Sequence, residues 1–343
     1  MEGHKSNLML LSDMVYQGTV WGPPLWNLHY ADARFAVRQN GFHELVFADD
    51  LNAFKSFEKE VTDEDVHDEM DECQRNVHAW GRANQVEFDP GKESKHILAT
   101  AGRGSGGSFK LLGVSFDPGL TMEGGIQDIV RSASWKLATV VRTNRYFTER
   151  KMMGLYKSKV LSFIECKTAA IYHACDSHLA LIDAIQKRFL KHLELSEEVA
   201  LMSHNLAPLS TRRDIAMLGL VHRAVLREGP AQFFDLFRPS SRQPVRFDTR
   251  AAARRHSRQL EDFRGRHFLE LERRSAFGLV GVYNLLPEFV VQSPTVSCFQ
   301  SQLQEILRER ACAGDSNWPL IFPTHRFIQA SIAVIWLWSV YSV

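Results

Sequence analysis

Two adjacent carboxylates, Asp49 and Asp50, lie between short apolar runs of the chain. These runs contain Leu45, Val46, Phe47, Leu51, Ala53 and Phe54, with Asn52 as the only polar interruption. Apolar runs on both sides of a polar pair predict two strands joined by a tight turn, which would expose both carboxylates. Mg²⁺ prefers oxygen ligands, usually one or two carboxylates plus substrate phosphates. The pair is therefore a candidate metal site, although adjacent Asp residues in loops most often bind nothing.

The composition is that of an ordinary soluble globular protein. The chain has 343 residues, enough for one large domain or two to three smaller ones, with 45% hydrophobic and 24% charged residues. The net charge of +1 gives no global sign of nucleic-acid binding, but residues 58–72 hold nine acids and one Lys, whereas residues 241–275 hold ten Arg and five acids. This asymmetry suggests a surface that meets a polyanion, and two solvated helix faces would explain it equally well.

The cysteines indicate a reducing compartment. Five cysteines form no Cys-x-x-Cys pair and the sequence shows no signal peptide, which predicts free thiols and an intracellular location, nucleus or cytoplasm. Cys166, His173, Cys175 and His178 lie close in sequence but fit no zinc spacing. The apolar segment 331–343 is shorter than the roughly 20 residues that a spanning helix needs, so no membrane partner is expected.

Helices and strands are mixed in the first third of the chain. A Gly- and Pro-rich loop is followed by a predicted helix from about Pro24 through Val37. Thr62 and Asp65 form an approximate capping box for an amphipathic helix that Gly81 ends. The apolar stripe of this helix contains Val66, Met70, Cys73, Val77 and Trp80.

The pattern becomes helical farther along. Residues 86–88 and 96–100 are strand-like, with a turn at residues 89–91 between them, and residues 109–116 are typical of a strand with a central Gly. From Gly125 onward the periodicity is helical almost throughout. Three helical faces are predicted from Met152, Leu155, Tyr156, Lys159 and Phe163; from Leu179, Ile182, Ile185, Phe189 and Leu193; and from Ile215, Leu218, Val221 and Val225.

These patterns predict an α+β fold in three parts. Residues 1–122 would form an antiparallel sheet with packed helices, and residues 123–238 a helical region. Residues 239–343 would form a helical C-terminal region of unknown role, after a Pro- and Ser-rich break at residues 239–244.

Four sequence blocks occur in an order that is known from one family. They are Gln17-Gly18 with Trp21-Gly22-Pro23, Phe47-Ala48-Asp49-Asp50, Phe88 with Lys92, and Leu111-Leu112-Gly113-Val114. In these blocks the chain resembles reverse transcriptases of the non-LTR (LINE-like) retroelement type, in the palm motifs usually labelled B to E. The resemblance covers the first third in detail. It continues more loosely through Tyr156-Lys157, Gln186-Lys187-Arg188-Phe189, Pro208-Leu209 and Arg212-Arg213.

The resemblance implies an RNA-directed DNA polymerase, a nucleotidyltransferase that uses Mg²⁺ or Mn²⁺. Asp49 and Asp50 would be the metal carboxylates of a partial palm, and Lys92 would approach the nucleotide phosphates as a proton donor. Gln17 and Gly18 would lie against the incoming nucleotide and template. The hairpin that grips the primer terminus would be formed by Leu112 and Gly113, and the helices after residue 122 would form a thumb. The implied partners are an RNA template, a DNA primer and dNTPs.

The chain also departs from the family pattern. Upstream of Gln17 the only acids are Glu2 and Asp13, so block A, which supplies another metal carboxylate, is not found, and neither are the basic fingers. The resemblance therefore implies a truncated polymerase core that is inactive alone and is completed by an upstream part of the same polyprotein.

Simpler interpretations stand beside these roles. A lone lysine such as Lys92 is more often a solvated turn residue. Trp21 and Trp26 are expected to pack in the protein rather than to stack on bases. The arginines around Arg258 could contact nucleic acid, but solvated helix charge explains them at least as well. A non-catalytic nucleic-acid-binding remnant and a degenerate retroelement reading frame remain the alternatives.

Overall fold

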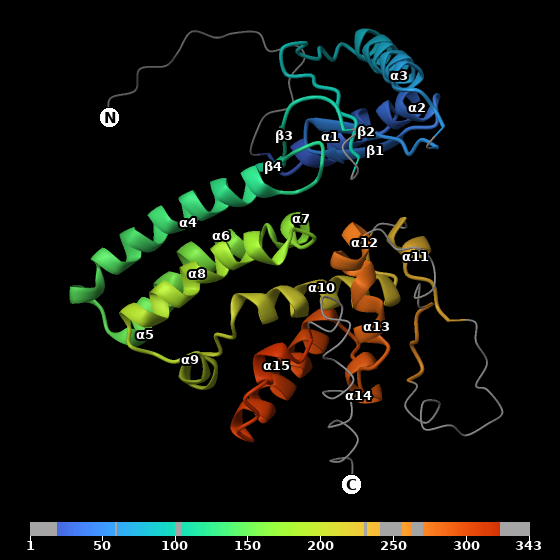
Figure 1. Cartoon of the computed structure of the whole chain (residues 1–343). Coiled ribbons are helices and arrows are strands. Elements are labelled where there is room, and N and C mark those ends of the chain that lie inside the picture. Colours follow the sequence, from blue (N-terminus) through green and yellow to red (C-terminus); the bar gives the residue numbers. More distant parts are fainter. Residues whose placement is uncertain are drawn as a thin grey trace, which may run out of the picture. The chain divides into compact units, whose positions relative to one another are not determined.

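The structure is a computed structural model that describes residues 19–58, 60–99, 104–229, 232–240, 256–261 and 270–322. These residues form two compact units that divide between Lys95 and His96, and each unit is described by itself (Figure 1). Helices and two small antiparallel sheets are present, so the mixed α+β class is confirmed. In the described ranges the last strand ends at Phe116 and a long helix begins at Glu123, where the sequence predicted the change to helices.

The first unit contains two short helices, a hairpin and one long helix. They are α1 (Gly22–His29), α2 (Ala33–Arg38), β1 (His43–Phe47), β2 (Asp50–Phe54) and α3 (Asp63–Ala83). The single helix predicted from Pro24 through Val37 is wrong, because the chain turns between Tyr30 and Asp32. This turn lets both Tyr30 and Val37 become buried, with 5% and 0% of their surface exposed.

The predicted hairpin around the carboxylate pair is confirmed. β1 and β2 pair antiparallel with Phe47 opposite Asp50, which leaves Ala48 and Asp49 as a two-residue turn. Ala48 has a φ of 55°, in the left-handed region that tight two-residue hairpin turns often require. Within the described part of the chain the two strands hydrogen-bond only to each other, so both outer edges of the pair are open.

Helix α3 begins as the sequence predicted and ends slightly later. The Thr62 side chain accepts a hydrogen bond from the Asp65 N–H at 3.2 Å, which confirms the cap. Val66 and Cys73 of the predicted stripe are buried. Gly81 does not end the helix, which continues to Ala83. A Cβ at Gly81 would come within 2.6 Å of the Val86 carbonyl oxygen, so this glycine allows the chain after the helix to pack closely.

The first unit has a small core and much exposed apolar surface. The core cluster contains only three buried side chains, Val37, Phe42 and Cys73. The exposed large apolar side chains are Val20, Trp21, Leu25, Leu28, Phe35, Leu45, Val46, Phe47 and Phe54. The expectation that Trp21 is a packing residue is therefore wrong, because 72% of its surface is exposed.

The second unit begins with another hairpin. β3 (Phe109–Leu111) pairs antiparallel with β4 (Val114–Phe116), joined by Leu112 and Gly113 with φ values of 48° and 78°. Two positive φ values identify a type I′ turn, so the single strand predicted over residues 109–116 is wrong. The predicted strands at 86–88 and 96–100 are also absent from the described residues, apart from one isolated bridge between Ile97 and Ser105.

The rest of the second unit is helical. Its longer helices are α4 (Glu123–Arg142), α5 (Glu149–Tyr156), α8 (Asp176–His192), α9 (Glu197–His204), α10 (Leu209–Val225) and α15 (Val296–Cys312). Its shorter elements are η1 (Asn144–Tyr146), η2 (Lys157–Leu161), α6 (Ser162–Glu165), α7 (Thr168–Ile171), α11 (Gln232–Leu236), α12 (Glu270–Arg274), η3 (Ala276–Leu279), α13 (Val280–Tyr283), α14 (Glu288–Val291) and η4 (Trp318–Leu320). α4 packs along α8, and α10 packs along α15 (Figure 1).

Large apolar cores hold this unit together. Most residues of the predicted faces pack inward: Met152, Tyr156, Leu179, Ile182, Ile185, Phe189, Ile215, Leu218 and Val221 are all buried. Lys159 is exposed, so its place on the first predicted face is wrong. The rings of Tyr156 and Phe189 stack with centroids 4.2 Å apart. No described helix is both long and apolar enough to cross a membrane.

Candidate functional site

Asp49 and Asp50 are exposed at the tip of the β1–β2 hairpin. The turn is held from α1, because the Trp26 indole N–H donates to the Ala48 carbonyl oxygen at 2.9 Å. This bond connects a helix side chain to the backbone directly before Asp49. Trp26 is therefore a packing residue, as expected, and it fixes the position of the two carboxylates relative to α1.

Tyr30 lies beneath this turn. Its ring stacks on Trp26 with centroids 5.2 Å apart and meets Trp80 of α3 edge-on at the same distance. Burial, followed by the charges of Asp49 and Asp50, raises the pKa of Tyr30 to about 12. The hydroxyl is buried and has no hydrogen-bond partner among the described residues. The Tyr30 hydroxyl is thus a donor without a partner in the described ranges, on a ring that stacks on the residue that holds the turn.

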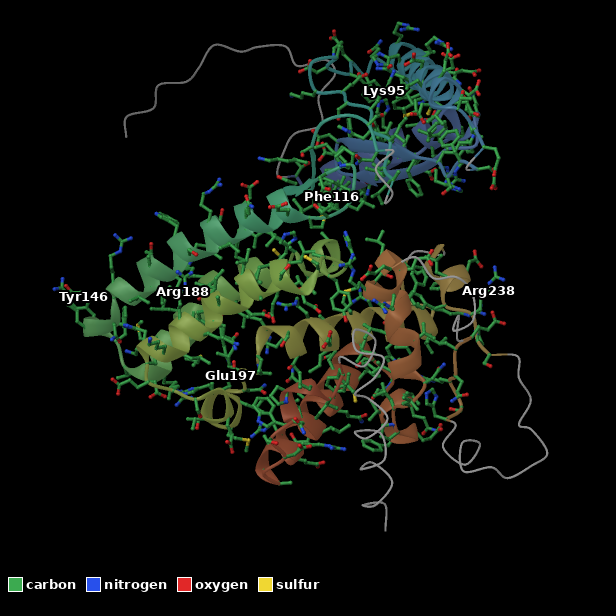
Figure 2. All side chains as sticks on the ribbon, in the orientation of Figure 1. Lys95, Phe116, Tyr146, Arg188, Glu197 and Arg238 are labelled. Atoms are coloured by element: carbon green, nitrogen blue, oxygen red, sulfur yellow. The ribbon has the colours of Figure 1, made fainter. Side chains whose placement is uncertain are left out.

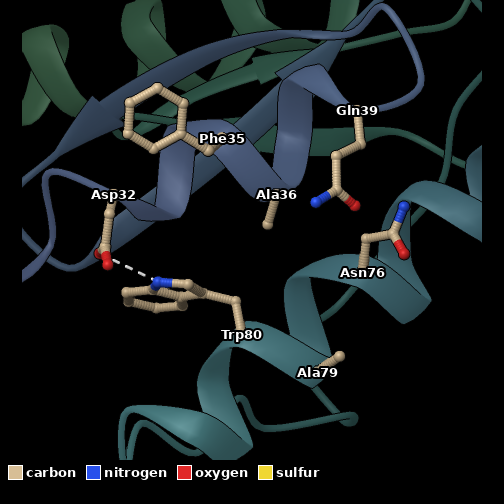
Figure 3. A pocket seen from close by; sticks show the side chains of 7 residues that line it. All are labelled: Asp32, Phe35, Ala36, Gln39, Asn76, Ala79 and Trp80. Carbon is tan, nitrogen blue, oxygen red and sulfur yellow. Dashed lines mark hydrogen bonds between the residues drawn. The ribbon is translucent and has the colours of Figure 1, made fainter.

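Trp80 is itself anchored across the unit. Its indole N–H donates to Asp32 Oδ1 at 2.9 Å, which ties α3 to the turn between α1 and α2. Trp80 and Asp32 also line a shallow groove of about 330 Å³ between α2 and α3 (Figure 3). The other lining residues are Phe35, Ala36, Gln39, Asn76 and Ala79. The ring that supports Tyr30 from below is therefore fixed in orientation.

The donor set fits a hard divalent cation only in part. Two carboxylates at one turn supply the one or two protein ligands with which Mg²⁺ is commonly held, the remaining positions going to water and substrate phosphate. The unpaired Tyr30 hydroxyl offers a hydrogen-bond donor in the aromatic cluster that holds the turn. No group of three or more His, Cys, Asp or Glu able to hold a metal occurs in the ranges that the structure describes. Asp49 and Asp50 alone would therefore hold such an ion weakly.

Lys92 lies in the turn after α3. Its backbone N–H donates to the Asp89 carbonyl oxygen at 3.0 Å, and its ammonium pairs with the Asp89 carboxylate at 3.7 Å. The Lys92 side chain is 85% exposed. This geometry confirms the predicted tight turn, and the proton-donating role of Lys92 stays a prediction.

Of the remaining members of the implied site, two belong to the second unit and two are outside the described residues. Leu112 and Gly113 form the type I′ turn of the β3–β4 hairpin in the second unit, and Leu112 is 53% exposed. The hairpin that the resemblance implied at these residues is therefore present, and its contact with a primer stays a prediction. Gln17 and Gly18 lie outside the described residues.

Several residues of the looser resemblance have structural partners. Gln186 is buried and donates to the Ala207 carbonyl oxygen at 2.9 Å. Both Arg213 Nη groups pair with the Asp183 carboxylate, at 2.5 and 2.9 Å. Arg258 donates to the Val291 carbonyl oxygen at 2.8 Å, so the solvated charge expected for it is wrong. The other arginines of that stretch lie outside the described residues, except Arg273 and Arg274.

Tyr30 was not among the site residues predicted from the sequence. Trp26 and Tyr30 are four residues apart at the end of α1, a spacing that places two side chains on one helical face. A single helix over residues 24–37 was predicted instead, so Tyr30 was taken as one of its interior positions and not as the residue at the end of a shorter helix. The approach of Trp80 could not be read from periodicity, since it depends on how α3 returns to α1.

A basic and aromatic surface lies on the outer side of α4 in the second unit. Residues 129–148 contain four basic residues and no acid. Arg131, Trp135 and Arg142 follow one exposed stripe of α4, and Trp135 is 67% exposed. Beyond the helix end, Tyr146 is 66% exposed and points away from the unit, with the Arg145 guanidinium 4.7 Å from its ring centroid (Figure 2). We call these five residues the α4 surface.

Comparison of the chain with protein-family models, with curated proteins and with solved structures found no match.

Proposed function

We propose that the chain contains part of the palm of a reverse transcriptase of the non-LTR retroelement type, with Asp49 and Asp50 as its metal-binding carboxylates. The observation that supports this most is the β1–β2 hairpin. It presents both carboxylates at an exposed two-residue turn, held in place by Trp26, with the sequence Phe47-Ala48-Asp49-Asp50 that suggested the family.

The chemistry of this turn suits phosphoryl transfer. When bound there, divalent ions would activate a primer 3′-hydroxyl and stabilise the departing pyrophosphate. Phosphoryl transfer leaves a protein little covalent work, so its side chains contribute positioning and charge neutralisation. Asp49 and Asp50 would bind and orient the ions. Lys92, which is 85% exposed and pairs with Asp89 on its own turn, would exchange that partner for a phosphate.

Polymerase activity of the chain by itself is not expected. Palm chemistry of this type uses a further carboxylate from a neighbouring strand, and the open edges of the β1–β2 pair provide room for such a strand. Removing one catalytic group of a set that acts together typically lowers rates by several orders of magnitude. We propose that an upstream segment of the same polyprotein supplies this strand.

Binding of a primer–template under controlled ion conditions tests the proposal. The affinity of the chain for an RNA–DNA hybrid is expected to rise when Mg²⁺ or Mn²⁺ is added, and the rise should be lost in Asp49→Asn and Asp50→Asn. Primer extension by the chain alone should give no template-dependent product. Two results would contradict the metal role of the turn: an affinity that does not change when the ions are added, or an affinity that rises in both variants as much as in the unsubstituted chain.

A second function, nucleic-acid binding without catalysis, is favoured by the α4 surface. Its arginines can pair with phosphates and its exposed rings can stack on bases, which is how proteins hold single strands without reading sequence. Here the affinity would fall steeply with salt and would not depend on Asp49 or Asp50. Arg142→Glu would weaken this binding, whereas Arg238→Glu, elsewhere on the second unit, serves as the matched control (Figure 2).

A further inference from the structure

We propose that Tyr30 is a positioning residue of the Asp49–Asp50 site, whose hydroxyl donates a hydrogen bond to the Asp49 carboxylate when a divalent ion is bound. The inference rests on the proposed metal role of the turn and adds a residue that the sequence blocks do not include. Tyr30 would not touch the ion; it would hold the carboxylate oxygen that the ion leaves free.

The Tyr30 hydroxyl lacks a hydrogen bond in a buried position. Tyr30 is 5% exposed and its hydroxyl has no partner among the described residues. A buried polar group without a hydrogen bond destabilises a fold. A Phe would fill the same space between Trp26 and Trp80 without this cost, so packing alone does not account for the hydroxyl.

The Tyr30 ring is also fixed in orientation. Trp26 stacks on one face of the Tyr30 ring and bonds to Ala48, and Trp80, anchored by Asp32, meets the ring edge-on. These contacts leave the ring little freedom. The hydroxyl therefore keeps one position relative to the turn. A hydrogen bond that orients a metal ligand requires such a fixed donor.

The Tyr30 hydroxyl carries its proton at neutral pH, because tyrosine ionises only at about pH 10. The hydroxyl can then gain its missing hydrogen bond by donating to an acceptor, and the side-chain acceptors at this turn are carboxylate oxygens. The ion would hold Asp49 in the orientation that receives this bond.

Terbium(III) luminescence tests the inference, because Tb³⁺ takes hard oxygen ligands and its emission is sensitised by nearby indole rings such as Trp26. Asp49→Asn and Asp50→Asn are expected to abolish sensitised binding at this turn. Tyr30→Phe should raise the dissociation constant about tenfold, the usual loss when a partner of a metal ligand is removed. Phe289→Ala, which removes an exposed ring in the second unit that belongs to neither proposed binding site, should leave the dissociation constant unchanged.

Unfolding without ions supplies an independent readout. Tyr30→Phe should raise the denaturant midpoint of the first unit, since it removes the unpaired hydroxyl. A purely structural tyrosine would instead give a lower midpoint. Wild-type affinity in Tyr30→Phe, with binding still lost in the two Asp variants, would overturn the role of Tyr30 alone. Terbium binding that neither Asp variant changes would overturn the metal site and the role of Tyr30 together.

Discussion

The two units differ in how they are stabilised and in what they could do. The first unit carries the carboxylate turn on a two-stranded hairpin over a core cluster of three buried side chains, and nine large apolar residues are exposed in its described part. The second unit is more than twice as long and buries most of its apolar stripes in two large clusters, and eleven such residues are exposed among those that the structure describes. The candidate metal site thus belongs to the more weakly packed first unit, and the larger buried cores belong to the helical second unit.

The largest effect is expected from the core of the second unit. Phe189→Ala removes a fully buried ring that stacks on Tyr156, so the free energy of unfolding should fall by about 3–5 kcal/mol. Phe289→Ala is the matched control, because that ring is 59% exposed and its loss should cost less than about 0.5 kcal/mol. Denaturant unfolding measures both. Equal losses would show that the second unit is not stabilised by its buried stripes.

The buried ion pair of the second unit should come next. Arg213→Met keeps the side-chain volume but leaves Asp183 without its bidentate partner, and the Arg213 side chain is only 6% exposed. Because Asp183 is 22% exposed, we expect a loss of about 2–3 kcal/mol, somewhat below that of a fully buried pair. Arg131→Met, in an ion pair whose Arg and Asp128 side chains are 78% and 50% exposed, should change the stability by less than about 0.5 kcal/mol.

Acidification should affect the second unit before the first. Burial holds the pKa of His222 and His256 below their usual 6.5, so unfolding takes up protons and this stability is lost as the pH falls from about 7 through the folded-state pKa. The loss is at most about 1.4 kcal/mol per pH unit for each His. In the first unit, Glu44 is partly buried, which acts to raise its pKa, but its hydrogen bond to Arg38 holds the pKa below the usual 4.5.

The contribution of Glu44 is therefore lost only below about pH 4.5. Peptide-resolved hydrogen exchange at pH 7.5, 5.5 and 4, corrected for intrinsic rates, separates the two units. Destabilisation that begins in the first unit above pH 5.5 would reverse the expected order.

The smallest expected effect concerns the cap of α3 in the first unit. Thr62→Ala removes the side-chain oxygen that accepts from the Asp65 N–H, and the stability of the first unit should fall by about 1 kcal/mol. Thr148→Ala is the control, because Thr148 at the start of α5 makes no such cap bond within the described residues. Equal losses of stability in Thr62→Ala and Thr148→Ala would show that the Thr62 cap does not stabilise the first turn of α3.

Local patterns predicted the elements better than their arrangement. The apolar runs around Asp49 and Asp50 gave the hairpin, and the Thr62 cap gave the start of α3, because both depend on residues close in sequence. The local pattern predicted a strand through Leu112, and only the family resemblance implied a hairpin there, because a positive φ at leucine has no compositional signal. Tyr30 and Trp80 meet only after the chain has folded back through the hairpin and α3, so no periodicity could place them together.

The most direct test of the central claim is paramagnetic broadening by Mn²⁺ in the amide spectrum of the full chain. The account predicts that low Mn²⁺ concentrations first broaden the resonances of Ala48, Asp49 and Asp50, together with Tyr30, and that Asp49→Asn removes this effect. Broadening that centres instead on the acidic residues 58–72 around the start of α3, unchanged in Asp49→Asn, would contradict the assignment of the turn as a metal site.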